Sequence, residues 1–445
     1  MGKREKIELM EEVFTFRKIY KAYLDCRNLK RSTVNAVSFE YNLERRLFSL
    51  QERMKEGSYR PGRSICFVAT EPVYREIFAA DFEDRVVHHL LINELEEFGE
   101  KKFVFNSFSC RKGKGTHFGV KRLKKSVFRR NYQNKLYYLQ MDISGFFMSI
   151  DKRVLYAVVK KFVLKQRKSE KWKRDVLWLS KIIIFHQVTK NYVKKGDLSL
   201  FSLVPKRKSL FGSREGTGLP IGNYSSQFFA NLYLDQLDQF VKRKLKCKHY
   251  FRYVDDFILL SEDKEQLKQW RDEIEEFLGD YLKLKVSHKK TKLHAVDKGI
   301  DFLGYFVISD YVLARRRVVK TLKKKLDLIK EGEGRDIKER QLQVAMINSY
   351  FAHFKHCNSK RLREHFCRYV FYKFNIYHTE QFEKVLLKKA GRKELVIKKS
   401  CLKRRRKEKI NEKQKKIREE RRARLKSVFA EASLVGQDMR CGYKN

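Results

Sequence analysis

The 445-residue sequence has no stretch approaching the roughly 20 consecutive apolar residues of a membrane-spanning helix. Its first residues, Met1–Lys6, lead into no apolar core of the kind found in a signal peptide. The eight cysteines include no C-x-x-C pair, so neither a zinc site nor a disulfide framework is indicated. No internal repeat is visible. These absences predict a cytoplasmic protein with reduced thiols and no membrane partner.

Acidic residues are outnumbered, because 54 aspartates and glutamates face 102 lysines and arginines, for a formal net charge of +48. Self-repulsion destabilises a folded chain of that charge unless a polyanion neutralises it. Nucleic acid is the expected partner, with an anionic membrane surface or a ribosome- or chromatin-associated role as the alternatives. Aromatic residues at 13% and hydrophobic residues at 42% predict a folded body, long enough for two or three domains.

Changes in composition divide the chain into a helical segment, a mixed strand and helix region, a basic helical region and a basic tail: 1–61, 62–310, 311–395 and 396–445. In the first segment, Leu43, Leu47, Leu50 and Met54 recur at helical spacing and predict a packed helix. Residues 165–214 are more polar and basic, and we interpret them as an insertion. The tail is predicted to be a solvated helix, a segment that folds on RNA, or a solubilising extension.

The most informative motif is Tyr253-Val254-Asp255-Asp256, which lies between two runs of strand-forming residues. A third candidate carboxylate, Asp142, follows an apolar run upstream. An isolated Asp-Asp pair would be an ordinary polar turn. Phosphoryl transfer to a nucleotide, however, uses two divalent cations about 4 Å apart that bind the attacking and leaving oxygens, and Mg²⁺ prefers hard oxygen ligands. We therefore predict that the three aspartates are catalytic and, with Ile143, bind two Mg²⁺ ions, with Mn²⁺ as an alternative.

An aromatic residue, Phe147, follows Asp142 by five positions. At that distance from a metal ligand, its ring would lie near the sugar of an incoming nucleotide and leave no room for a ribose 2′-hydroxyl. The pair Phe146-Phe147 could equally be read as core aromatics. The spacing favours the first interpretation and predicts the use of deoxynucleotides.

Two glycine-containing segments are candidates for nucleotide binding. Gly216–Asn231 is a glycine-rich turn that runs into a helix, and Ile221 and Gly222 lie where the backbone can approach a nucleotide or a template base. The basic loop Ser107–His117 offers cations for a triphosphate or a template backbone, although a generic basic loop is the alternative. The candidate triphosphate-binding residues are Arg75, Arg111 and Lys112.

Further basic and aromatic residues follow the aspartate pair. Lys292 is a candidate general acid toward leaving pyrophosphate, on the weak basis of one lysine among many. Asn348–His356 interleaves aromatic and basic residues, and Lys355 is predicted to contact a nucleic-acid backbone. His353 and His356 are interpreted as backbone contacts or core residues and not as metal ligands.

Taken in order, these residues resemble reverse transcriptases over about residues 15–375. The resemblance implies an α+β right-hand polymerase fold, with fingers, an antiparallel palm sheet with packed helices, a helical thumb and, in this chain, a basic C-terminal extension. It implies that Asp142, Asp255 and Asp256 are the catalytic carboxylates and that Phe147 is the steric gate. It also implies template RNA, a cDNA primer and deoxynucleoside triphosphates as partners. The residues implied to contact primer and template are Tyr253 and the primer-grip turn Phe302, Leu303, Gly304 and Tyr305.

One departure points to a subgroup. Most reverse transcriptases carry Leu-Pro-Gln-Gly where this chain has Leu219-Pro220-Ile221-Gly222, and the substitution is similar to that in diversity-generating retroelements. The segments 111–117 and 197–200 resemble that group too. The resemblance implies error-prone copying at template adenines, a structured element RNA and a small basic accessory protein. Glu83 is a second departure, since the related pattern has arginine there, and a carboxylate facing a triphosphate would repel it.

Two other functions remain open at this point. A related reverse transcriptase could serve a bacterial antiviral defence system, or the chain could be an RNA-binding scaffold with an inactive polymerase fold. Three intact carboxylates weigh against the scaffold. No endonuclease or H–N–H motif is visible, and the basic C-terminus lacks the carboxylates that an RNase H domain needs.

Overall fold

The computed structural model describes residues 12–28, 33–71, 73–130, 135–308, 310–329 and 337–374. Contacts within the chain separate two units, one of residues 1–318 with 356–358 and the other of residues 319–355 with 359–445. The predictions for the tail, 396–445, lie outside the described residues. No helix in the described part is long and apolar enough to cross a lipid bilayer. The six cysteines in that part are free thiols.

Three helices open the first unit: α2 (Phe16–Arg27), α3 (Val34–Glu40) and α4 (Leu43–Lys55). Thr15 caps α2, because its hydroxyl accepts a hydrogen bond from the backbone N–H of Lys18. The predicted helix of the apolar stripe is α4, which buries Leu47, Leu50 and Met54. The helical prediction for this stretch is confirmed.

A small sheet has the strand order β2-β1-β4. Strands β1 (Ser64–Ala69) and β2 (Arg75–Ala79) are antiparallel, and β4 (Tyr192–Lys194) pairs with β1 in parallel. The segment interpreted as an insertion supplies β4, together with helix α9 (Glu170–Phe185) and the short 3-10 turns η1 (Leu198–Leu203) and η2 (Lys206–Lys208). Because α9 buries Trp172, Val176 and Leu179, the segment is part of the core despite its polar composition.

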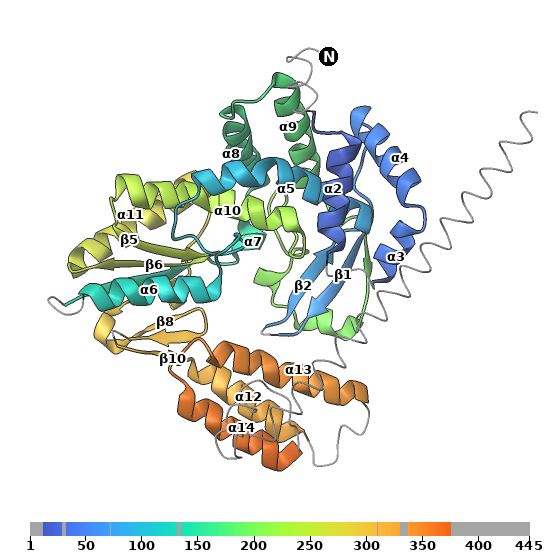
Figure 1. Cartoon of the computed structure of the whole chain (residues 1–445). Helices are drawn as coiled ribbons and strands as arrows, with labels where there is room; N and C mark the ends of the chain where they lie inside the picture. The colour runs from blue at the N-terminus through green and yellow to red at the C-terminus, as the bar shows by residue number, and fades with distance from the viewer. Residues whose placement is uncertain are drawn as a thin grey trace, which may run out of the picture. The chain divides into compact units, whose positions relative to one another are not determined.

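The central sheet has the order β5-β6-β3-β7 and is antiparallel throughout. Its strands are β3 (Tyr137–Asp142), β5 (His249–Tyr253), β6 (Asp256–Ser261) and β7 (Lys292–Ala295). The short turns η4 (His288–Lys290) and η5 (Val296–Lys298) flank β7. Because side chains alternate along a strand, the sheet has two apolar faces. Figure 1 shows α6 (Thr116–Arg130) along one face, and α10 (Tyr224–Gln239) with α11 (Lys264–Leu282) along the other.

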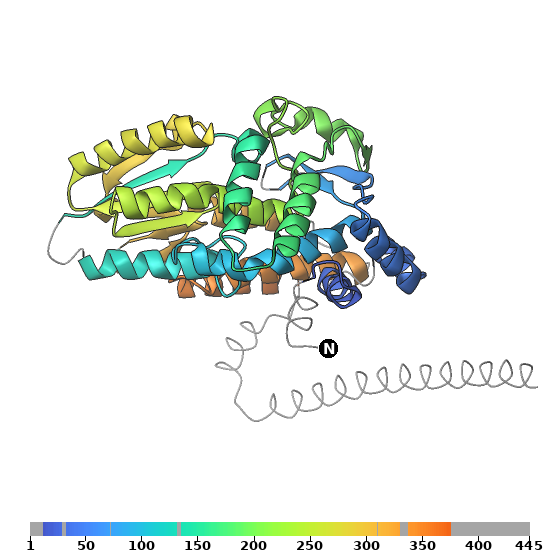
Figure 2. The same cartoon turned by 90° about the horizontal axis from the view of Figure 1, so that it is seen from above.

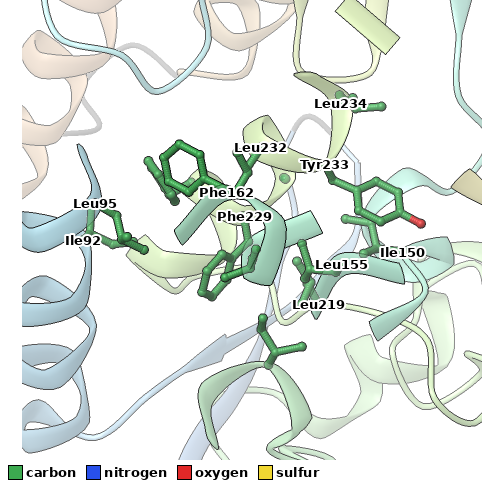
Figure 3. Close-up of a cluster of buried hydrophobic side chains, with 14 of the residues drawn as sticks. Ile92, Leu95, Ile150, Leu155, Phe162, Leu219, Phe229, Leu232, Tyr233 and Leu234 are labelled. Atoms are coloured by element: carbon green, nitrogen blue, oxygen red, sulfur yellow. The ribbon is translucent and has the colours of Figure 1, made fainter. Parts of the chain in front are cut away.

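The larger core cluster lies on the α10 side of this sheet. Helix α10 is buried around most of its circumference, as expected of a helix at the centre of a domain, and it continues into the π-helical turn η3 (Phe240–Lys244). Helices α5 (Phe82–Lys102) and α8 (Lys152–Leu164) pack against it, and α8 lies beside α9 in both Figure 1 and Figure 2. Figure 3 shows side chains from these helices meeting in the cluster, among them Ile92, Leu95, Leu155, Phe162, Phe229 and Leu232.

A third sheet, β10-β9-β8, packs on the other apolar cluster of the first unit. Its strands are β8 (Ile300–Phe302), β9 (Tyr305–Val307) and β10 (Val312–Ala314). Helix α12 (Arg316–Leu328) begins in the first unit and continues into the second, which also holds α13 (Ile337–Phe354) and α14 (Lys360–Phe374). Within the second unit the rings of Phe354 and Phe366 stack. The described part of residues 311–395 is thus largely helical, as predicted.

Candidate active site

The three predicted aspartates meet at one end of the central sheet. Asp142 ends β3 and lies directly opposite Asp256, the first residue of β6. Asp255 lies in the turn between β5 and β6, and its carbonyl oxygen accepts a 3.3 Å hydrogen bond from the backbone N–H of Ile143. Residues more than 100 positions apart in the sequence are therefore joined through strand pairing.

The turn that carries Asp255 is strained. Tyr253 pairs with Asp256, which leaves a two-residue turn, and Val254 adopts a φ of 54°. A β-branched residue is a genuine outlier in this left-handed region, and such strain costs roughly 1–3 kcal/mol unless the surroundings enforce it. Arg252 contributes to that enforcement, because its Nη1 donates a 3.1 Å hydrogen bond to the Val254 carbonyl oxygen.

Two carboxyl groups of the site hold protons more tightly than free aspartate does. Burial raises the pKa of Asp256 to about 7, helped by the charges of Asp142 and Asp255, while a hydrogen bond from Gln140 opposes the shift. Burial also raises the pKa of Asp255 to about 6, again with repulsion from Asp142. The end of the sheet therefore concentrates negative charge in a desolvated place, which favours binding of a cation.

Two residues that sequence reasoning missed contact these aspartates. The Lys290 Nζ atom lies 2.7 Å from both carboxylate oxygens of Asp142. The Gln140 amide donates hydrogen bonds of 3.0 and 3.3 Å to the carboxylate of Asp256 and one of 3.1 Å to the carbonyl oxygen of Asp301. The i, i+2 spacing of Gln140 and Asp142 on one strand signals a shared face, whereas nothing distinguishes Lys290 among so many lysines.

The donor set fits divalent metal ions by its chemistry. Three carboxylates and nearby backbone carbonyls are the hard oxygen ligands that Mg²⁺ and Mn²⁺ prefer. Within the described ranges, no three His, Cys, Asp or Glu groups already converge in metal-binding geometry. In the structure Asp142 faces Lys290 and Asp256 faces Gln140. The Lys290 ammonium thus occupies a position where positive charge is favoured.

The predicted steric gate, Phe147, and the candidate nucleotide-binding residue Ile221 share one apolar cluster. Phe147, on the single-turn helix α7 (Phe146–Ser149), and Ile221 both pack against a cluster that includes Phe78 of β2. The Ile221 carbonyl oxygen accepts a 2.8 Å hydrogen bond from the Phe78 N–H. Gly222 has a φ of 122°, and an added Cβ would lie 2.9 Å from Ile77 Cγ2, so the close approach requires glycine.

Cations gather beside the carboxylates. The positive charge of Arg75, at the start of β2, helps to lower the pKa of Asp255 against the dominant effect of burial. Burial lowers the pKa of Lys208, and the charges of Arg75, Arg207 and Lys290 lower it further. Arg75 was a predicted triphosphate ligand, whereas Lys208 was missed because it lies in the segment interpreted as an insertion.

Arg111 was predicted to bind a triphosphate, but in the structure its guanidinium pairs with groups of its own loop and of α5. Its buried guanidinium donates to both Glu100 carboxylate oxygens at 2.8–3.0 Å and to the carbonyl oxygens of Val104 and Ser107 at 2.7 and 2.9 Å. It therefore fixes the shape of its own loop. The neighbouring Lys112 is exposed, and its Nζ lies 2.6 Å from Glu96.

Glu83, the departure from the related pattern, forms an ion pair with Arg53. Glu83 lies in the first turn of α5, and its carboxylate is 2.6 Å from Arg53 of α4. This ion pair accounts for the negative charge at that position.

The predicted primer-grip residues form a tight hairpin turn. Phe302 pairs with Tyr305, and both turn residues, Leu303 and Gly304, have positive φ angles of 52° and 86°. The turn is linked to the aspartates, because the Asp301 carbonyl oxygen accepts from Gln140.

The other predicted contacts are divided between the two units. Tyr253 ends β5 next to the strained turn, and Lys292 pairs with Gln140 at the start of β7. Lys355 directly follows α13 in the second unit.

Comparison with known proteins identifies sequences related to this chain. The sequence model of the family described as "Reverse transcriptase (RNA-dependent DNA polymerase)" matches residues 71–307. Protein YkfC of Escherichia coli (strain K12) is 23% identical over 328 residues, which cover 65% of this chain and 78% of that protein. Nuclear intron maturase 1, mitochondrial, of Arabidopsis thaliana is 23% identical over 308 residues, which cover 54% of this chain and 42% of that protein.

Solved structures give a more distant likeness. Telomerase from Candida albicans, in complex with a fragment of telomeric RNA, aligns with a TM-score of 0.41 and 14% identity, over 66% of this chain and 54% of that chain. Apo telomerase from Candida tropicalis aligns with a TM-score of 0.39 and 12% identity, over 57% of this chain and 48% of that chain. The chain thus spans about half the length of the telomerase chains and less than half of the maturase.

Proposed function

Since the chain belongs to the reverse transcriptase family, whose model matches more than half of it, we propose that it copies the template RNA of a diversity-generating retroelement into cDNA with errors concentrated at template adenines. The family membership makes it an RNA-directed DNA polymerase. The observation that carries the finer proposal is Ile221 in place of the usual glutamine, next to Gly222 and against strand β2.

The chemistry follows from the aspartate cluster. Reverse transcriptases use divalent metal ions, which when bound supply positive charge to the attacking and leaving oxygens. Asp142, Asp255 and Asp256 are the residues we propose as their ligands, with Mg²⁺ as the expected ion. Lys290 pairs with the Asp142 carboxylate and would have to release it for Asp142 to ligate a metal ion. Arg75 and Lys208 supply positive charge for the triphosphate of the incoming nucleotide.

Sugar and base selection are assigned to the apolar cluster. The Phe147 ring excludes a ribose 2′-hydroxyl by its bulk. Ile221 offers only an apolar side chain where a glutamine would offer a donor and an acceptor. A site that hydrogen-bonds its substrate rejects a wrong one far better than an apolar site does. Loss of that amide supports lowered fidelity at this position.

The partners follow from the same proposal. They are template RNA, a cDNA primer, deoxynucleoside triphosphates and a small basic accessory protein. A role in antiviral defence would keep the polymerase and change only the RNA and its context. The Arabidopsis relative is an intron maturase by name, which adds intron RNA as a third context.

The test is synthesis of cDNA by the full-length protein on its RNA with Mg²⁺, followed by sequencing. The proposal expects product with substitutions enriched opposite adenine. It also expects Ile221→Gln to reduce that enrichment while Ile221→Leu retains it. Faithful product from the wild type would refute the mutagenic role and leave the polymerase intact. Asp255→Asn/Asp256→Asn should make no product, and activity in that variant would remove the assigned metal site.

A further inference from the structure

A cavity of about 480 Å³, open to solvent, adjoins the candidate active site. Its walls come from the residues after Asp142, from residues 206–217 and from the end of α11 with the residues that follow it. Among the residues that the structure describes, five basic ones line it and no carboxylate does. These basic residues are Lys206, Arg207, Arg214, Lys283 and Lys285.

The five positive charges are poorly neutralised. Arg214 approaches Asp151 at 3.7 Å and is otherwise exposed. Lys206, Arg207, Lys283 and Lys285 form no ion pair with any residue that the structure describes. Mutual repulsion among unpaired cations raises the energy of the ligand-free wall, and an anion inside the cavity relieves it. The lining therefore selects for a highly charged anion.

The cavity and the aspartates share backbone. Ser144 lines the cavity, and its N–H donates a 2.8 Å hydrogen bond to the Lys285 carbonyl oxygen. Two residues further on, the N–H of Ser287 donates a 2.8 Å hydrogen bond to the carbonyl oxygen of Asp142 itself. These two hydrogen bonds fix the position of the cavity wall relative to Asp142 at the end of β3.

Positive charge continues from the cavity to the aspartates. Gly145 lines the cavity with a φ of 56°, and an added Cβ there would lie 3.0 Å from the Arg207 carbonyl oxygen. Arg207 lines the cavity, while its neighbour Lys208 interacts electrostatically with Arg75 and Asp142. An anion released at the aspartates meets a continuous series of cations that leads into the cavity.

We propose that this cavity binds inorganic pyrophosphate, the leaving group of the polymerase reaction. The inference rests on the proposed function, in which the primer 3′-hydroxyl loses its proton to water and its oxygen forms a bond to the α phosphorus. The bond from the α phosphorus to the bridging oxygen breaks, and that oxygen leaves with its electron pair as part of pyrophosphate. A small, multiply charged product fits a 480 Å³ cavity with cations on several sides. A nucleic-acid backbone would instead need a groove with cations spaced along its length.

The direct test is calorimetric titration of the full-length protein with sodium pyrophosphate in the presence of EDTA. In EDTA no metal ion bridges pyrophosphate to the aspartates, and the cavity variant separates binding in the cavity from binding to Arg75 and Lys208. We expect saturable one-to-one binding that Arg207→Gln/Lys285→Gln weakens by roughly tenfold or more and that Arg207→Lys/Lys285→Arg retains. The matched control, Arg45→Gln/Lys55→Gln, removes the same charge from exposed positions of α4. Equal weakening in the control, or no weakening in the cavity variant, would overturn the proposal.

A second measurement separates this inference from the proposed function. Primer extension on RNA is followed at increasing pyrophosphate, with each variant normalised to its own uninhibited rate. The cavity variant should need roughly tenfold more pyrophosphate for half-inhibition than the α4 control. If the wild type makes cDNA but the two variants are inhibited alike, the cavity assignment fails and the polymerase stands. If the wild type binds pyrophosphate in the cavity but makes no cDNA on any RNA, the polymerase fails and the anion site stands.

Discussion

The Arg252 guanidinium and the Asp238 carboxylate form an ion pair in which neither side chain is exposed, with N–O distances of 2.7 and 2.6 Å. The pair joins β5 to α10 directly behind the turn of Asp255. Tyr250 adds a 2.8 Å hydrogen bond to the same carboxylate. Because Arg252 also holds the strained Val254, the pair positions the turn and takes no part in the chemistry.

Asp238→Asn should therefore destabilise the fold, because it leaves a buried guanidinium without a counter-charge. We expect a loss of about 3–5 kcal/mol in the free energy of unfolding, measured by chemical denaturation. The exposed pair of Arg271 and Asp272 is the control, and Asp272→Asn should leave the denaturation midpoint unchanged. Tyr250→Phe is the milder variant, with an expected loss of about 1–3 kcal/mol. A folded Asp238→Asn protein of wild-type stability would contradict the argument.

The raised pKa of Asp256 predicts how stability depends on pH without metal. A carboxyl group whose pKa is higher in the folded than in the unfolded state favours folding at low pH, and this contribution disappears as pH rises through about 7. Asp256→Asn removes the ionisable group and keeps its shape. At pH 8 in EDTA, the variant should have a Tm higher than the wild type by about 2–4 °C or more, with a smaller difference at pH 5. An equal or lower Tm at pH 8 would show that burial of the charged Asp256 carboxylate does not destabilise the fold.

In the proposed metal site Lys290 would compete with a metal ion for the Asp142 carboxylate, so we expect Lys290→Gln to tighten Mn²⁺ binding in the absence of nucleotide. The lysine is mostly exposed, with 61% of its side chain accessible, so the expected gain is modest. An exposed ion pair is worth about 0.2–1 kcal/mol, or up to about fivefold in affinity. Electron paramagnetic resonance of free Mn²⁺ measures the difference. Lys289→Gln, at the neighbouring exposed position, is the control, and a similar gain there would mean that only net charge matters.

Phe147→Ala should relax the choice of sugar. Removing the ring makes room for a 2′-hydroxyl, so the preference for deoxynucleotides over ribonucleotides should fall by roughly 10- to 200-fold in kcat/KM. Single-nucleotide extension with each substrate gives the ratio. Phe147→Tyr retains the bulk and should retain the preference. An unchanged ratio in the alanine variant would place the sugar elsewhere.

Gly222→Ala tests the close approach of the loop to β2. The added methyl group would meet Ile77 at 2.9 Å and the Phe78 carbonyl oxygen at 3.0 Å in a backbone conformation that disfavours alanine. We expect a lower Tm and reduced cDNA synthesis. Gly279→Ala is the matched control, because an added methyl group there would have nothing within 4 Å and α11 should gain about 0.5–1 kcal/mol. Wild-type activity in Gly222→Ala would mean that the loop can move without penalty.

The parts of the site that could be predicted from sequence are those that carry a local signal. Asp142, Asp255 and Asp256 stand at the ends of strand-forming runs, and strand ends meet where a sheet is antiparallel. Gly222 was found through its glycine-rich turn, and the turn at Leu303 through the resemblance to reverse transcriptases.

The rest depends on distant contacts. Lys290 lies 148 positions from Asp142, and its role arises only when η4 is brought beside β3. Arg111 has the sequence signature of a phosphate ligand, yet Glu100 on α5 neutralises it. Burial and pairing of charges follow from tertiary structure, and a chain with 102 lysines and arginines gives no local sign of which are paired.

The amide of Gln140, shared between Asp256 and Asp301, has a mechanical consequence for a polymerase that moves along its template. It fastens the hairpin of the aspartate pair to the hairpin of Leu303 and Gly304 through a single side chain. A shift of one hairpin against the other would break that link, at a cost of about 0.5–1.5 kcal/mol. The shared amide therefore favours movement of the two hairpins as one unit when nucleic acid advances across them.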